Sequence, residues 1–225
     1  MKHWLSLFTC ALLSFVTGSA YSQAYPVKPV RIMVGYVPGG GVDTTARMVG
    51  QALGDLWGQQ VLIENRPGAA GNVATEYTAK QPPDGYTLVL CNIGSHAVTP
   101  ARFAKKLNYD PIGDFAFPAM IGGVPNIFMV HPSFPAKHLG QFISYAKSNP
   151  GKINFGSSGV GASPHLSIEL FKMRAGINIV HVPYKGAAEA LRDALAGQIE
   201  ASVGNLAGAP IAAVRSGRMR ALGVT

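Results

Sequence analysis

The sequence predicts an α/β protein, and three observations support this prediction. Short apolar runs alternate with amphipathic segments along most of the chain, which is the pattern of strands alternating with helices. An apolar run, Val30–Val34, leads through Pro38-Gly39-Gly40-Gly41 into a helical pattern. A second Gly- and Ser-rich turn, residues 156–163, also follows a strand and precedes a helix. Because such turns present backbone N–H groups and a helix N-terminus to anions, the pair predicts an anion held between two lobes.

The first 24 residues predict a secretory signal peptide. Lys2 precedes an apolar stretch from Trp4 to Val16, which is too short to span a membrane stably, and small residues follow it. We favour cleavage after Ala24, with Ala20 as the alternative. We therefore expect an exported, soluble protein.

The sequence after the signal peptide predicts the following strands and helices. Apolar runs bounded by turn residues predict strands at 30–34, 61–63, 86–92, 153–156, 179–184, 199–204 and 221–224, with one or two more within 119–130. Amphipathic runs predict helices at 43–57, from about 72 to 80, and at 139–148, 164–174, 187–195 and 209–216. Ser163 is the expected N-cap of the helix that begins with Pro164.

The middle of the chain predicts a crossover between two lobes. Residues 101–117 are polar and interrupted by proline, unlike the regular alternation on either side. We expect a first lobe over residues 25–105 and a second lobe over 106–225.

Composition excludes several classes of function. The formal net charge is +8, but the basic residues are scattered rather than gathered into the stripe that nucleic-acid binding needs. Cys91 is the only cysteine after the expected signal peptide, so no intramolecular disulfide can form. The histidines show no paired metal-ligand spacing, so we expect no metal site.

Known catalytic and nucleotide-binding motifs are incomplete in this sequence, because required residues are missing at specific positions. Thr44 stands where a dinucleotide fingerprint has its third glycine, and no phosphate-loop lysine follows the first turn. Val160 stands where a nucleophile elbow around Ser158 would need its second glycine. Either glycine turn taken alone has a purely structural interpretation, whereas two matching turns with polar donors favour a function.

Further candidate contacts lie beyond the carboxyl ends of predicted strands, where open α/β sheets bind ligands. These residues are Ser95, His96, Tyr184, Lys185 and Asn205. Asp43 is either a ligand contact or an acidic residue favourably placed in the first turn of a helix.

Several segments together resemble the Bug family of extracytoplasmic solute receptors. They are Val37-Pro38-Gly39-Gly40 with Asp43 and Ala46-Arg47, then Glu64-Asn65-Arg66-Pro67-Gly68-Ala69, Pro83-Asp84-Gly85-Tyr86-Thr87-Leu88, Asn154-Phe155-Gly156-Ser157, His181-Val182-Pro183-Tyr184-Lys185-Gly186 and Gly197-Gln198. They occur in the family's order over nearly the whole mature chain.

The resemblance implies a two-lobed periplasmic-binding-protein (Venus flytrap) fold, type II-like, that closes on a small carboxylate without performing chemistry. It implies no cofactor, a monomer, and delivery of the ligand to permease subunits of a tripartite tricarboxylate transporter or to a sensor kinase. The ligand-binding residues it implies are Tyr36, Gly40, Gly41, Asp43, Ser95, His96, Ser157, Ser158, Gly161, Ser163, Tyr184 and Asn205.

The chain departs from the family pattern in two ways. Family members continue beyond the equivalent of Thr225 and return to the first lobe, so we expect this lobe to be incomplete at its C-terminal side. Gly204 replaces an often acidic residue, which disfavours an amino-acid ligand. The alternatives are an exported serine hydrolase that uses Ser158 and a non-functional truncated receptor fragment.

Overall fold

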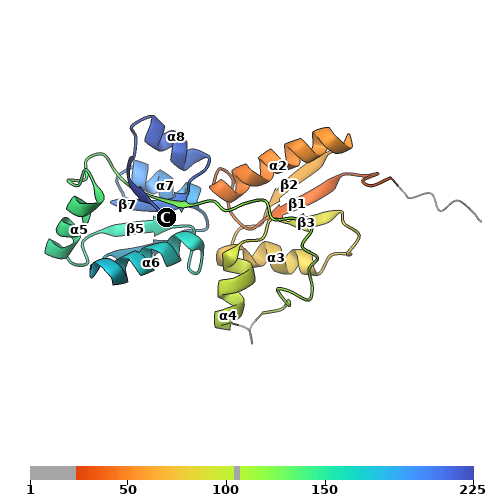
Figure 1. Ribbon diagram of the computed structural model, residues 1–225, viewed down its shortest axis with the longest axis horizontal. Coiled ribbons are helices and arrows are strands. Elements are labelled where there is room, and N and C mark those ends of the chain that lie inside the picture. Colours follow the sequence, from red (N-terminus) through yellow and green to blue (C-terminus); the bar gives the residue numbers. More distant parts are fainter. Residues whose placement is uncertain (1–23, 104–106) are drawn as a thin grey trace, which may run out of the picture.

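The structure is a computed structural model that describes residues 24–103 and 107–225. The expected signal peptide lies outside the described residues, apart from Ala24. Figure 1 shows two bodies side by side, joined by the green segment that precedes strand β4 (Asn126–Val130). The predicted two-lobed α/β fold is therefore confirmed. Among the described residues, no helix is both long enough and apolar enough to cross a membrane.

The first body contains a parallel three-stranded sheet of order β2-β1-β3. Its strands are β1 (Val30–Val34), β2 (Val61–Asn65) and β3 (Thr87–Val89). Its helices are α2 (Gly41–Trp57), η2 (Ala69–Gly71), α3 (Asn72–Ala79), η3 (Gly94–Val98) and α4 (Thr99–Phe103). The predicted strand at 86–92 ends early because Asn92 Oδ1 accepts the Gly94 N–H at 2.8 Å and begins the turn into η3.

The second body contains a five-stranded mixed sheet of order β6-β5-β7-β4-β8. Its strands are β4 (Asn126–Val130), β5 (Asn154–Ser157), β6 (Val180–Pro183), β7 (Ala201–Asn205) and β8 (Arg220–Val224). Its helices are α5 (Leu139–Ser148), α6 (Ser163–Ala175), α7 (Ala187–Leu195) and α8 (Ala209–Arg215). β5 pairs in parallel with β6 and β7, while β4 runs antiparallel to β7 and β8.

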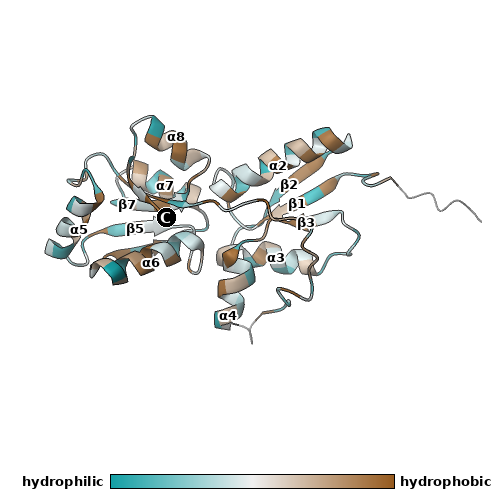
Figure 2. Cartoon of the chain, viewed as in Figure 1, coloured by the Kyte–Doolittle hydropathy of each residue, from teal (hydrophilic) through white to brown (hydrophobic). Residues whose placement is uncertain are grey.

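Strand β4 supplies side chains to both cores of the second body, because successive strand residues point to opposite faces. Phe128 and Val130 join the cluster under α5 and α6, which includes Phe142 and Ile168. Ile127 and Met129 join the cluster under α7 and α8. Figure 2 shows apolar (brown) and hydrophilic (teal) residues alternating along these helices. The first body has one smaller cluster, formed by Ile32, Val34, Tyr36 and Ala46.

Candidate functional site

The loops at the carboxyl ends of strands from both lobes meet at one junction. In the β1–α2 loop, Val37 packs so closely on Gly186 of the second lobe that a Cβ there would overlap its Cγ2. A Cβ at Gly41 would lie 2.6 Å from Asn205 Cβ, and one at Gly208 would lie 2.5 Å from Thr44 Oγ1. The absence of side chains at these glycines therefore lets the two lobes touch.

Asp43 lies beneath the first glycine turn and anchors it. Its carboxylate is 2% exposed and accepts hydrogen bonds from Gly39 N–H (2.9 Å), from Arg47 Nε (2.9 Å) and Nη2 (3.0 Å), and from Asn65 Nδ2 (2.8 Å). Burial raises the pKa of Asp43, but these hydrogen bonds outweigh it and hold the pKa below its usual value. The geometry thus favours a positioning role for Asp43 under the turn.

Helix α2 begins at Gly41, after the N-cap Gly40, with no side-chain cap on its first backbone N–H groups. Gly40 is the N-cap residue and makes no side-chain cap, so the first N–H groups of α2 lack a capping partner. They lie beside Asn205 and Ala207 of the second lobe. The N-terminus of α2 therefore faces the junction, as the first glycine turn predicts.

Tyr36 fixes a strained loop next to this turn. Ala69 and Ala70 both have positive φ, 47° and 55°, which is costly for residues other than glycine. The Tyr36 hydroxyl donates to Ala70 O at 3.0 Å and lies 3.3 Å from Asn92 Oδ1. Burial raises the pKa of Tyr36 to about 12. Tyr36 thus acts at the site by holding the η2 loop.

The second glycine turn connects β5 to α6 and is built around Ser157. This residue is fully buried, and its Oγ lies 2.7 Å from His181 Nε2 and accepts the Gly159 N–H at 3.2 Å. Helix α6 begins at Ser163 with Ala162 as its N-cap. The prediction of Ser163 as N-cap was therefore wrong, because its hydroxyl donates to Asn126 Oδ1 at 3.3 Å instead.

A cavity of about 260 Å³ lies between the lobes. It is lined by Gly68, Ala69 and Ala70 from the first lobe and by Ser158, Gly159, Val160, Pro183, Tyr184 and Lys185 from the second. Of the twelve residues implied as ligand contacts, Ser158 and Tyr184 line it. No described residue hydrogen bonds with the Ser158 hydroxyl or carries a carboxylate paired with the Lys185 ammonium. These two groups can therefore meet an anion.

The remaining predicted residues lie around this cavity without lining it. Ser95 Oγ lies 2.9 Å from His96 Nδ1, and the His96 ring packs edge-on against Phe115 and Phe117. Burial lowers the pKa of His96, whose Nε2 is buried without a hydrogen-bond partner. Asn205 donates to Asn126 Oδ1 at 3.3 Å, and the Gly161 N–H donates to His165 Nδ1 at 3.2 Å.

Three residues that line the cavity are not among the contacts predicted from the sequence: Gly68, Ala69 and Ala70. The signal available was the run Pro67-Gly68-Ala69-Ala70-Gly71, which we treated as a turn and as part of the family resemblance. Alanine gives no sequence indication that it adopts positive φ, so only the structure reveals the strained loop.

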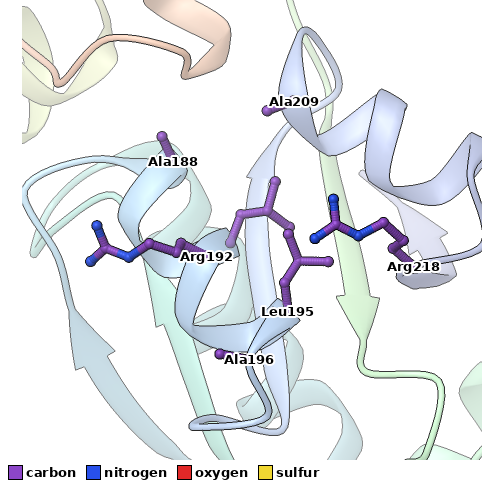
Figure 3. Close-up of a pocket in the computed structure, with 7 residues that line it drawn as sticks. Ala188, Arg192, Leu195, Ala196, Ala209 and Arg218 are labelled. Carbon is purple, nitrogen blue, oxygen red and sulfur yellow. The ribbon is translucent and has the colours of Figure 1, made fainter.

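A larger hollow of about 430 Å³ lies between α7 and α8, and its lining residue Ala188 lies close to Gly39 of the first lobe. Figure 3 shows Leu195 at its centre, Arg218 reaching toward it and Arg192 pointing away. None of the predicted site residues lines it. The interlobe cavity is therefore the stronger candidate site.

The described residues offer little support for hydrolysis or metal binding at the cavity. Ser158 has no histidine partner there, and two serines that do have one, Ser95 and Ser157, are fully buried. Within the same residues, no cluster of three or more His, Cys, Asp or Glu side chains could hold a metal ion.

Comparison with known proteins agrees with this geometry. A family model described as the tripartite tricarboxylate transporter family receptor matches residues 45–225. A UPF0065 protein of Bordetella pertussis is 38% identical over 96% of this chain and 66% of its own length. BugT of the same bacterium is 34% identical over 90% of this chain and 62% of its own length. The chain thus spans somewhat less than two thirds of the length of these relatives.

Two solved structures are similar to this chain. A Rhodopseudomonas palustris protein solved with adipate superposes with a TM-score of 0.83 at 38% identity, covering 89% of this chain and 67% of that one. MatC from the same organism, solved with bound malate, superposes with a TM-score of 0.80 at 30% identity over the same shares.

Proposed function

The chain belongs to the tripartite tricarboxylate transporter receptor family, and from this premise we propose that it captures a small carboxylate in its interlobe cavity. The family membership agrees with the resemblance identified from the sequence motifs. The observation that carries the proposal is that Ser158 and Lys185 both line a cavity formed by both lobes.

The chemistry of the cavity suits a carboxylate. A carboxylate accepts hydrogen bonds only, and the Ser158 hydroxyl is a donor without a partner among the described residues. The Lys185 ammonium supplies the opposite charge. The uncapped N-terminus of α2 lies at the same junction and favours negative charge. Adipate and malate, the ligands solved with two relatives, are both small dicarboxylates.

Under this proposal, the residues of the expected site have one of two roles. Ser158, Tyr184 and the N-terminal residues Gly40 and Gly41 contact the ligand. Positioning of the loops around it falls to Tyr36, Asp43, Ser95, His96, Ser157, Gly161, Ser163 and Asn205. Specificity among carboxylates then depends on the cavity lining.

We further propose the biological setting that the family implies. The protein acts in the periplasm as a monomer, with lobes over residues 25–105 and 106–225 that close on the ligand. It delivers the ligand to membrane permease subunits or to a sensor kinase and performs no chemistry. Receptors of the family bind solutes, so release to a partner is the step that follows capture.

Titration calorimetry with malate, adipate and citrate tests the proposal. We expect at least one of these ligands to bind, and Ser158→Ala to weaken its affinity about 10- to 150-fold, the cost of one hydrogen bond to a charged group. Lys185→Gln should weaken binding more at low salt than at high salt, because salt screens an exposed charge.

Lys152→Gln is the matched control, since Lys152 is also exposed but precedes β5 at the end away from the cavity. Equal effects of Lys185→Gln and Lys152→Gln would contradict the assigned site. Ester hydrolysis that disappears in Ser158→Ala would instead support the alternative of an exported serine hydrolase.

A further inference from the structure

Two histidines flank the turn that carries Ser158. His165 in α6 and His181 in β6 have ring centroids 4.2 Å apart, and His181 also stacks on Phe155 at 4.9 Å. His181 Nε2 lies 2.7 Å from Ser157 Oγ, at the start of the turn. His165 Nδ1 accepts the N–H of Gly161, near the end of the turn, at 3.2 Å. The segment between these two contacts, residues 158–160, lines the interlobe cavity.

The hydrogen bond from Gly161 defines the charge state that His165 must have. A neutral imidazole has one nitrogen that accepts, whereas an imidazolium has two N–H donors and no acceptor. His165 can therefore hold the Gly161 N–H only while its Nδ1 is unprotonated. Gly161 itself has φ of 88°, a conformation that glycine adopts without a side-chain clash, so the backbone there depends on its contacts to stay in place.

The surroundings of His165 oppose a positive charge. Burial lowers the pKa of His165, and Lys172 in the same helix and Arg102 in α4 lower it further, while Glu169 opposes them. Glu169 is itself paired with Lys172 at 2.8 Å. Burial and the neighbouring His165 ring lower the pKa of His181 to about 4. A proton arriving at His165 therefore meets a second imidazole and basic groups from two helices.

We propose that His165 is a positioning residue for the carboxylate site, and that the Ser158 turn binds its ligand only while His165 is neutral. This proposal rests on the proposed function of the same cavity. Protonation of His165 releases the Gly161 N–H and separates the two rings, so the turn leaves the conformation that presents Ser158. The affinity of the protein for a carboxylate is then reduced in proportion to the fraction of molecules that still hold the turn in place.

A simple electrostatic effect would act in the opposite direction. An imidazolium near the cavity attracts an anion, so affinity would rise on acidification if charge alone mattered. The positioning role predicts that the affinity falls on acidification. The fall becomes steeper once the pH is below the ordinary pKa of histidine. It approaches about tenfold per pH unit below the pKa of His165 in the folded protein. The sign of the pH dependence therefore separates the two effects.

Calorimetric titration of adipate from pH 8 to pH 5 tests this, with His165→Asn as the informative variant. Asparagine places Oδ1 where histidine has Nδ1, so it accepts the Gly161 N–H without taking up a proton. We expect His165→Asn to bind as the native protein does at pH 8 and to lose the steep fall in affinity at lower pH. His165→Ala, which has no acceptor, should bind weakly at every pH.

His138→Asn is the matched control. His138 Nδ1 also accepts a backbone N–H, that of Gln141 at 3.4 Å, but at the start of α5 rather than beside the cavity. This variant should keep the pH dependence of the native protein. Protonation of adipate affects all variants alike, so the difference between them isolates His165. Identical pH profiles for the native protein and His165→Asn would overturn the proposal.

A second measurement needs no ligand and separates the two proposals. In the glycine-labelled protein, the Gly161 amide resonance should shift with pH at the same midpoint as the His165 ring protons, and this shift should vanish in His165→Asn. A Gly161 amide that does not follow His165 overturns the positioning role even if adipate binds. If the amide follows His165 but no carboxylate binds at pH 8, the proposed function fails and the proposal that rests on it fails with it.

Discussion

At the scale of single residues, the first glycine turn depends on the buried carboxylate of Asp43. Its oxygens accept bonds from a backbone N–H, a guanidinium and an amide. Replacing Asp43 by Asn turns one acceptor into a donor that faces other donors. We expect Asp43→Asn to lower the free energy of unfolding by about 2–3 kcal/mol, the range for hydrogen bonds to charged groups, as measured by urea denaturation.

Asp55→Asn is the control in the same helix, because Asp55 is exposed and, among the described residues, its carboxylate accepts a hydrogen bond only from the Gln51 amide at 2.8 Å. The effect of Asp43 should also depend on pH. Its pKa in the folded state is lowered, so its stabilisation is present above the unfolded value of about 3.9 and is lost as pH falls through the folded value. A stability difference between native protein and Asp43→Asn that persists in strong acid would contradict this assignment.

Tyr36 provides the second prediction at this scale. Its hydroxyl holds the carbonyl of Ala70, whose φ of 55° is unfavourable for alanine. Tyr36→Phe should lower stability by about 1 kcal/mol and weaken carboxylate binding, because the η2 loop loses its restraint. Tyr145→Phe is the control, since no hydrogen bond of its hydroxyl occurs among the described residues. Equal effects on binding from the two variants would argue against the restraint.

At the scale of elements, contact between loops of different lobes permits closure. Gly186 has φ of −176°, which any residue adopts, but a Cβ there would overlap Val37 across the junction. Gly186→Ala should therefore leave the second lobe folded while it separates the lobes. We expect a larger radius of gyration in solution scattering and weaker carboxylate binding.

The control for this variant is Gly223→Ala in β8, where a Cβ would meet nothing within 4 Å. It should change neither scattering nor binding. A compact Gly186→Ala protein with native affinity would show that the β1–α2 loop and the α7 N-terminus do not need to touch.

Elements with strong local patterns were predictable from the sequence. The helices Leu139–Ser148 and Ala187–Leu195 have the predicted bounds because amphipathic periodicity and adjacent turn residues determine them. Strand β4 was less clear, since residues 119–125 are apolar but extended and largely exposed rather than paired. The N-cap of α6 was misassigned because Ser163 bonds to Asn126, a residue distant in sequence.

The candidate site was predictable only in part for the same reason. Two candidate anion-binding turns follow from glycine and serine patterns, and the structure brings both to one junction. Neither the strained Ala69-Ala70 pair nor the His165–Gly161 bond has a local pattern that predicts it. The Ala69-Ala70 loop is held by Tyr36, which is distant in sequence, whereas the His165–Gly161 bond joins residues four apart and needs the backbone geometry that the folded turn provides.

At the scale of the whole molecule, the two lobes differ in the size of their cores. The second lobe has extensive clusters on both faces of its sheet, whereas the first has a single cluster around Ile32 and Tyr36. Because stability scales with buried apolar surface, the first lobe should unfold more easily. Unfolding of the chain should therefore depart from two-state behaviour.

Trp57 makes this testable, since it lies in the first lobe, where it packs edge-on against Tyr25 at 5.7 Å. In the variant Trp4→Phe it is the only tryptophan. We expect its fluorescence to report a lower urea midpoint than far-ultraviolet circular dichroism, which the larger second lobe dominates. A carboxylate that binds both lobes should bring the two midpoints together, because it stabilises the state in which both are folded. Coincident midpoints without ligand would show instead that contact at the junction makes the two lobes unfold as one unit.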